Sequence, residues 1–330
     1  MKHLSIVVPE GTLILDTVVG TLNLFRMANN YAKRIGKFQE NLFEIDLVSR
    51  TMDPITCHKY FQISPTRTLE EVKATHLIII TSITGNMDEN LEKNEELIDW
   101  VRNQRIRNGS EIVSLCRSAF LLAETGLMNG KSCATHWVVH NQFESRFPKV
   151  ELLPEKVISE DNGIYSSGGA YSFLNMIIYL IEKFYGREVA IWCAKMGEID
   201  FDRINQDQFI IFSGQKDHGD EAILQAQEYI EEQFEKKLTI EELAGHFAMS
   251  PRTFIRRFKK ATLNTPLQYV QRIKIEAAKK KLESSTLHIN EVMYDVGYID
   301  EKAFRKTFKK YTGLSPMDYR KKYNREMAFA

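Results

Sequence analysis

Two groups of side chains in this sequence have the residue types and spacing for chemistry. The first surrounds Cys116, where an apolar run passes through Arg117 and Ser118 into a helical pattern. A cysteine at a sharp strand-to-helix turn with small neighbours has the outline of a nucleophile elbow. The helix N-terminus and Arg117 would both favour the thiolate, and His136 could complete a Cys-His pair for nucleophilic catalysis.

Each of these residues also has a structural interpretation. Cys116 fits a buried structural thiol or a ligand or redox sensor, and a polar residue such as His136 or Asp16 fits helix capping or a core hydrogen bond. The four cysteines form no CxxC pair and have no regular spacing, so neither a zinc site nor a disulfide framework is expected. The sequence therefore predicts no metal and no cofactor.

The second group consists of lysines and arginines on a motif that occurs twice. Its positions recur at a fixed offset of 50, which pairs Phe254 with Phe304, Phe258 with Phe308, Thr262 with Thr312, Pro266 with Pro316 and Tyr269 with Tyr319. A fixed period indicates one supersecondary unit used twice. From residue 249 to the end there are 19 Lys and Arg against 8 Asp and Glu, a net charge of +11, which leaves −11 for the preceding residues. Such concentrated positive charge is typical of a nucleic-acid binder.

The elements that must position these cations are two helix-turn-helix units. Ser250 and Asp300 are N-cap signals that follow short helical stretches at 240–247 and 290–296. The phenylalanine pairs, four residues apart, mark the buried stripe of each second helix. The side chains opposite that stripe are predicted to face the major groove of DNA: Arg252, Ile255, Arg256 and Lys259, and Lys302, Arg305, Lys306 and Lys309.

The connection between the two units is predicted to be one helix, residues 266–284, of about 28 Å. One turn of duplex DNA is about 34 Å, so this helix could hold both recognition helices against successive major grooves. The alternative is a helical interaction bundle that binds no nucleic acid.

The first 205 residues alternate β-rich runs with helical patterns. Runs at 5–8, 43–49, 76–80 and 111–115 flank helical segments such as 22–32 and 95–103. This order predicts an α/β domain with a mostly parallel, flavodoxin-like sheet and helices on both faces. In such sheets ligands bind beyond the carboxyl ends of the strands, where Cys116 is expected.

Both halves resemble known families. Residues 225–322 resemble the AraC/XylS transcription regulators, whose signature looks like the run from Gly297 to Arg320, although Leu263 and Lys302 stand where glycine and serine are common. With the turn at 166–170 and the segment at 186–190, the first half resembles the ThiJ/PfpI branch of the class I glutamine-amidotransferase-like fold, in the layout of a GlxA-like regulator. The resemblance implies a pocket region lined by Asp16, Cys116, Arg117, His136, Gly168 and Gly169.

The expected organisation is a ThiJ/PfpI-like sensor and dimerisation domain at 1–205, a linker at 206–220 and an AraC-type DNA-binding domain at 221–325. Arg117 and Ser118 replace the small Thr-Gly pair usual after the cysteine, so no enzyme activity is expected. The alternative is a bifunctional protein that retains Cys-dependent hydrolase or deglycase-like activity. Expected partners are double-stranded promoter DNA, an unidentified small-molecule effector, a second copy of the chain and, as a further candidate, RNA polymerase. Without a signal peptide or membrane span, a cytoplasmic location is expected.

Overall fold

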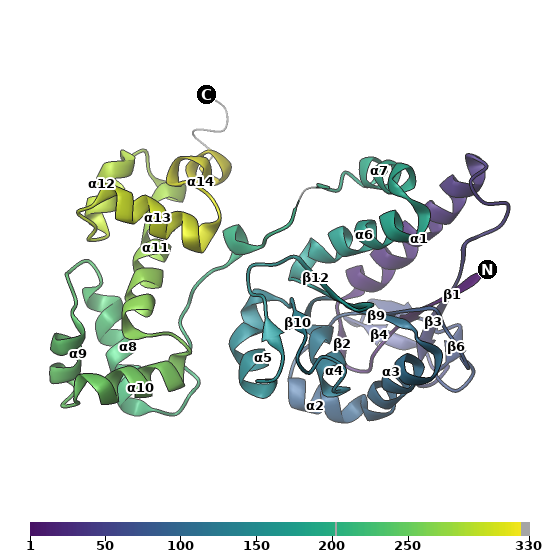
Figure 1. The fold of residues 1–330 in the computed structure, drawn as a ribbon, viewed down its shortest axis with the longest axis horizontal. Coiled ribbons are helices and arrows are strands. Elements are labelled where there is room, and N and C mark those ends of the chain that lie inside the picture. Colours follow the sequence, from purple (N-terminus) through teal and green to yellow (C-terminus); the bar gives the residue numbers. More distant parts are fainter. Residues whose placement is uncertain (202, 325–330) are drawn as a thin grey trace. The chain divides into compact units, whose positions relative to one another are not determined.

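The computed structural model describes residues 1–201 and 203–324, and the chain folds as two compact units (Figure 1). The first unit is Met1–Gln206 and the second begins at Asp207. None of the helices in the described ranges has the length and apolar composition of a membrane span. The two units are described separately below.

A seven-stranded sheet forms the centre of the first unit. Its strand order is β12-β13-β9-β7-β1-β3-β6. The neighbouring pairs are parallel except β12 with β13, so the predicted mostly parallel sheet is confirmed. The strands are β1 Lys2–Val7, β3 Phe43–Ser49, β6 Arg67–Thr68, β7 Leu77–Ile80, β9 Glu111–Ser114, β12 Ile158–Asp161 and β13 Ile164–Ser167.

Short strands and helices complete this unit. Three two-stranded ladders pair β2 Thr12–Leu13 with β8 Ile83–Thr84, β4 Ile55–Cys57 with β5 Phe61–Ile63, and β10 Ser132–Cys133 with β11 Glu151–Leu152. The helices are α1 Leu15–Arg34, α2 Met87–Lys93, α3 Glu95–Asn108, α4 Ala119–Glu124, α5 His140–Arg146, α6 Phe173–Tyr185 and α7 Arg187–Met196, with 3-10 turns η1 Cys116–Ser118, η2 Trp137–Val139 and η3 Ala170–Ser172.

Helices cover both faces of the sheet. α1, α6 and α7 pack together on one face, and α2, α3 and α4 lie on the other (Figure 1). The central strand β7 is apolar at every position and fully buried, as expected for a parallel strand with both faces covered. Because the parallel strands end at one edge, the turn after β9 places Cys116 at their carboxyl ends.

The second unit consists of helices. They are α8 Glu221–Gln233, α9 Ile240–His246, α10 Pro251–Thr262, α11 Pro266–Ser284, α12 Ile289–Asp295, α13 Glu301–Thr312 and α14 Pro316–Tyr323, preceded by a 3-10 turn, η4 Asp207–Phe209. α11 spans the predicted residues and joins two hydrophobic cores. Tyr269 and Val270 near its start belong to the first core, whereas Ile275, Ala278 and Leu282 belong to the second. α10 and α13 therefore lie at opposite ends of α11 (Figure 1).

The two helix-turn-helix units repeat each other in detail. Both phenylalanine pairs are fully buried, and Ser250 and Asp300 cap α10 and α13 as predicted. Thr262 and Thr312 each donate a 2.8 Å hydrogen bond to the carbonyl four residues before. Leu263, which replaces the expected glycine, adopts a left-handed conformation with φ +56°, matching Gly313 at φ +71°. The turn is thus retained, although a leucine carries a steric cost there.

Candidate ligand site and nucleic-acid interface

Cys116 occupies a sharp, left-handed turn between β9 and η1, with φ +59°. Ser118 stabilises this turn because its Oγ accepts from the Leu115 backbone N–H at 2.8 Å and donates to the Ile80 carbonyl at 2.8 Å. The Cys116 backbone N–H donates to Ser167 Oγ at 3.2 Å. A strained, strand-to-helix cysteine held from both sides has the backbone form of a nucleophile elbow.

The thiol, however, lies in an environment that disfavours its charged form. Cys116 is only 1% exposed, and this burial raises the pKa of the thiol despite hydrogen bonds from Ser82 and two backbone groups. Arg117 lowers the pKa only weakly, and its guanidinium donates to Thr84 Oγ1 at 2.7 Å. Arg117 therefore acts in the predicted direction, but the loss of water around the buried thiol has the larger effect, so the neutral thiol is favoured over the thiolate.

The His136 side chain caps a 3-10 turn and is not positioned by a hydrogen bond to the Cys116 thiol. Its Nδ1 accepts a hydrogen bond from the Val138 backbone N–H at 3.1 Å at the start of η2. Burial, followed by the charges of Arg117 and His140, lowers the pKa of His136 to about 4. Within the described ranges no hydrogen bond joins His136 to Cys116, so the expected Cys-His pair is not formed here.

The remaining predicted pocket residues divide into two groups. Gly168 and Gly169 lie beside the His136 segment, and a Cβ on Gly169 would stand 2.6 Å from the His136 ring. Asp16, in contrast, is exposed in the first turn of α1, and the residue whose pKa its charge raises is Cys57. The structure thus groups Cys116, Arg117, His136 and the two glycines at one sheet edge and shows no contact from Asp16 to the thiol.

Gln206 is part of this site and was not singled out from the sequence. It is 2% exposed, and its Oε1 accepts from the Gly169 backbone N–H at 3.0 Å. Its Nε2 lies 3.0 Å from the carbonyls of Thr135 and Pro154 and 3.2 Å from that of Lys156. A glutamine in a linker carries no pattern that would reveal this role before the chain is folded.

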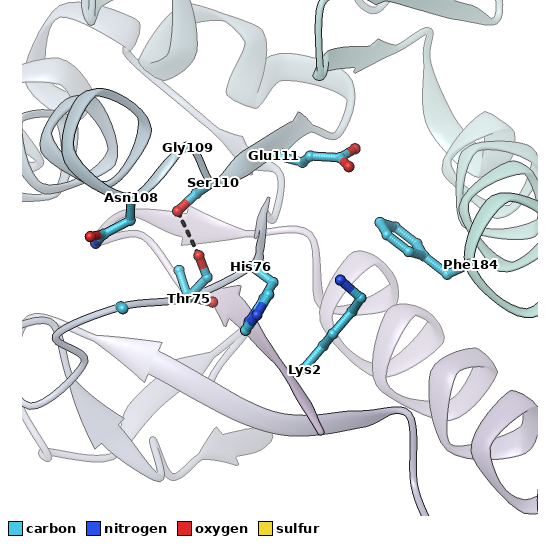
Figure 2. Close-up of a pocket in the computed structure, with 9 residues that line it drawn as sticks. Lys2, Thr75, His76, Asn108, Gly109, Ser110, Glu111 and Phe184 are labelled. Carbon is cyan, nitrogen blue, oxygen red and sulfur yellow. Dashed lines mark hydrogen bonds between the residues drawn. The ribbon is translucent and has the colours of Figure 1, made fainter. Parts of the chain in front are cut away.

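A separate pocket lies at the opposite, amino-terminal edge of the sheet (Figure 2). Lys2 and Glu111, which begin β1 and β9, line it together with His76 and Ser110. Ser110 Oγ donates to the Thr75 carbonyl at 2.6 Å. None of the predicted pocket residues lines this hollow, because they follow the carboxyl ends of the strands.

The predicted DNA-contacting side chains are all exposed on α10 and α13. On α10 these are Arg252, Ile255, Arg256 and Lys259, and on α13 they are Lys302, Arg305, Lys306 and Lys309. Arg305 also forms an ion pair with Glu301 at 2.7 Å, one turn earlier. Arg257, on the same helix as Arg256, instead pairs with Asp220 at 2.6 Å and joins α10 to the start of α8. Arg257 is thus engaged in a contact within the unit whereas Arg256 is exposed, a difference that only the packing reveals.

Comparisons with known proteins identify both units. A "Helix-turn-helix domain" family model matches residues 243–322, and a "DJ-1/PfpI family" model matches residues 30–183. The HTH-type transcriptional regulator GbdR of Pseudomonas aeruginosa is 23% identical over 316 residues, covering 94% of this chain and 83% of that protein. The chain thus carries a DJ-1/PfpI family domain followed by an AraC-type helix-turn-helix domain.

Two further known proteins are similar to part of this chain, one in sequence and one in fold. An isonitrile hydratase of Pseudomonas putida is 24% identical over 148 residues, which cover 44% of this chain and 62% of that enzyme. The crystal structure of an AraC family transcriptional regulator from Pseudomonas putida matches with a TM-score of 0.50 and 14% identity. It covers 59% of this chain and 99% of that chain. The structural likeness supports the fold.

The lowered pKa of the partly buried His136 leads to a pH prediction. In the folded protein the pKa of the His136 ring is lowered to about 4, so the ring resists protonation. In the unfolded chain the same ring takes up a proton near pH 6.5. The free energy of unfolding should therefore fall as the pH drops from 6.5 towards 4, by about 1–3 kcal/mol for this residue.

Urea unfolding of the full chain between pH 7 and 4.5 measures this effect. His136→Asn should flatten the dependence because asparagine keeps an acceptor for the Val138 backbone N–H but does not titrate. Parallel pH profiles for the two proteins would show that His136 is not the titrating group.

Proposed function

We propose that this regulator binds duplex DNA in a sequence-specific manner through α10 and α13, under control of a small-molecule effector bound in its first unit. The observation that carries the proposal is that two matching helices lie at the two ends of α11. In each helix the phenylalanine pair is buried and the four predicted DNA-contacting side chains are exposed. α11 has 19 residues and a length of about 28 Å. That length suits two successive major grooves, about 34 Å apart.

We assign effector binding to the carboxyl edge of the sheet, around Cys116, Arg117 and His136. Arg117 forms no ion pair among the described residues, so an anionic group on the effector fits its charge. The first unit acts as a non-catalytic sensor because burial raises the pKa of the thiol and His136 is not hydrogen-bonded to it. It also joins two copies of the chain, and this pairing doubles the DNA footprint and raises avidity through effective concentration.

Selection of duplexes from a random pool by the full chain tests this function. We expect enrichment of one sequence whose affinity falls with rising salt, and a sedimentation coefficient of a dimer for the free protein. A footprint longer than about two helical turns would support paired binding. Equal, salt-independent binding of selected and random duplexes would refute the DNA-binding assignment, and a monomer would refute the dimer.

A second candidate function is Cys-dependent hydrolysis by the first unit. The left-handed turn at Cys116 and the similarity to an isonitrile hydratase favour it. Turnover of amide, ester, glyoxal or isonitrile substrates that disappears in Cys116→Ser would establish this activity. Absence of turnover of these substrates by the wild-type chain would argue against the enzyme and in favour of the non-catalytic sensor.

A further inference from the structure

The segment between the two units is packed rather than loose. Residues 206–220, here called the strap, are the segment predicted from the sequence to be a linker, and polar and aromatic contacts fasten most of their length. Each contact described here lies within one unit: Gln206 belongs to the first, and the strap from Asp207 onward belongs to the second.

Gln206 fastens the start of the strap to the candidate ligand site. Its side chain bonds the Gly169 backbone N–H and the Thr135 carbonyl, so it joins the two segments that flank the His136 ring. Its own backbone N–H donates to the Glu155 carbonyl at 2.7 Å. A ligand that moves either flanking segment must therefore either move Gln206 with it or break these hydrogen bonds.

The next residues of the strap bind the second helix-turn-helix unit. The turn η4 packs against α13. Gln208 Oε1 accepts from Lys322 Nζ on α14 at 2.7 Å. The Ile210 carbonyl accepts at 2.6 Å from Lys279 Nζ on α11, whose side chain is 6% exposed and also paired with Glu276. A buried ammonium held in this way makes the attachment specific.

The remainder of the strap binds the first helix-turn-helix unit. The Phe212 ring packs edge-on against Tyr269, with centroids 5.2 Å apart. The Arg272 guanidinium lies 5.1 Å from the Phe212 ring and 5.0 Å from the Tyr311 ring of α13, so it contacts both the strap and the second helix-turn-helix unit. Asp220 ends the strap with its ion pair to Arg257 on α10.

We propose that the strap transmits the state of the ligand site to both helix-turn-helix units, with Gln206 as the positioning residue that anchors it. This inference rests on the proposed function for its regulatory meaning. Because adjacent residues 206 and 207 are fastened to different units, a shift of Gln206 is passed directly along the backbone to η4 and thence to α13. Holding this end in place keeps η4 on α13 and thus orders the second recognition helix.

The test breaks one attachment from its two sides in the full chain. Gln206→Ala removes the side-chain bonds, and Gly168→Ala places a Cβ 2.9 Å from Gln206 Oε1 and 3.0 Å from the Lys156 carbonyl. Each variant should raise amide exchange in residues 207–212 and α13 and should weaken binding to the selected duplex, about fivefold or more. The double variant should be no worse than either single variant, because both break the same attachment.

Gln225→Ala, at an exposed glutamine on α8, is the matched control and should leave both readouts unchanged. Amide exchange in β7 and β9 reports on the fold of the first unit and should stay as in the wild type. If Gly168→Ala does not fold, Gln206→Asn replaces it, since the shorter side chain cannot span the same acceptors. The proposal for the strap would be overturned by unchanged amide exchange in α13. It would also be overturned if the losses of DNA affinity in the two single variants multiplied in the double variant. Failure of the wild type to bind selected DNA would instead refute the proposed function.

Discussion

Replacing Arg256 with alanine is expected to weaken binding to the selected duplex by about 1–3 kcal/mol, roughly fivefold to 150-fold, and to relax base preference at one position. Arg256 is exposed on α10, opposite the buried Phe254 and Phe258, and forms no ion pair among the described residues. An arginine in that position can donate two hydrogen bonds to a guanine edge. The measurement is the dissociation constant by fluorescence anisotropy at fixed salt.

Lys306 occupies the equivalent position on α13 and provides the second arm of this test. If both recognition helices contact DNA at once, the losses for Arg256→Ala and Lys306→Ala should add in free energy, because the two sites share no partners. Lys310→Ala should weaken all sequences more evenly, as a phosphate contact does. Lys149→Ala, at an exposed position of the first unit, is the control. Wild-type affinity for both α10 and α13 variants would show that another surface binds DNA.

The largest effect on stability is expected for Gly297→Ala, at about 3–5 kcal/mol. Gly297 forms the turn between α12 and α13 with φ +74°, and an added Cβ would stand 1.9 Å from the Glu235 carbonyl oxygen. Backbone atoms cannot move aside as a flexible side chain would. The same glycine offers its carbonyl to Lys274 Nζ at 2.8 Å, so its displacement also disturbs the contact of a buried lysine side chain.

Far-UV circular dichroism during urea unfolding, together with amide exchange in α12 and α13, measures this loss. Gly245→Ala is the matched control, because Gly245 lies within α9, and a Cβ there would meet no atom within 4 Å. It should stabilise the helix by about 0.5–1 kcal/mol. Native-like exchange in α13 of Gly297→Ala would contradict the close contact with Glu235.

The helix-turn-helix half could be predicted closely from the sequence because its signals are local. N-caps at Ser250 and Asp300, a proline at the start of α11, and phenylalanines four residues apart each act within one or two turns of helix. The same logic placed β1, β3, β7 and β9 but not β6, β12 or β13, since short apolar runs bounded by turns are typical of buried parallel strands. The repeat at 50 residues then linked the two units without any tertiary information.

The chemistry of the first unit, by contrast, depended on the tertiary structure. The sequence places an arginine and a helix start beside Cys116, which favour a thiolate, but the desolvation that raises the thiol pKa comes from segments distant along the chain. Asp16 was grouped with Cys116 by resemblance, yet it is exposed and its charge acts on Cys57. Gln206 and residues 213–220 of the strap are polar, turn-like residues that are typical of linkers. Their attachments join residues as far apart as 206 and 135, or 208 and 322, and such long-range hydrogen bonds leave no periodic pattern in the sequence.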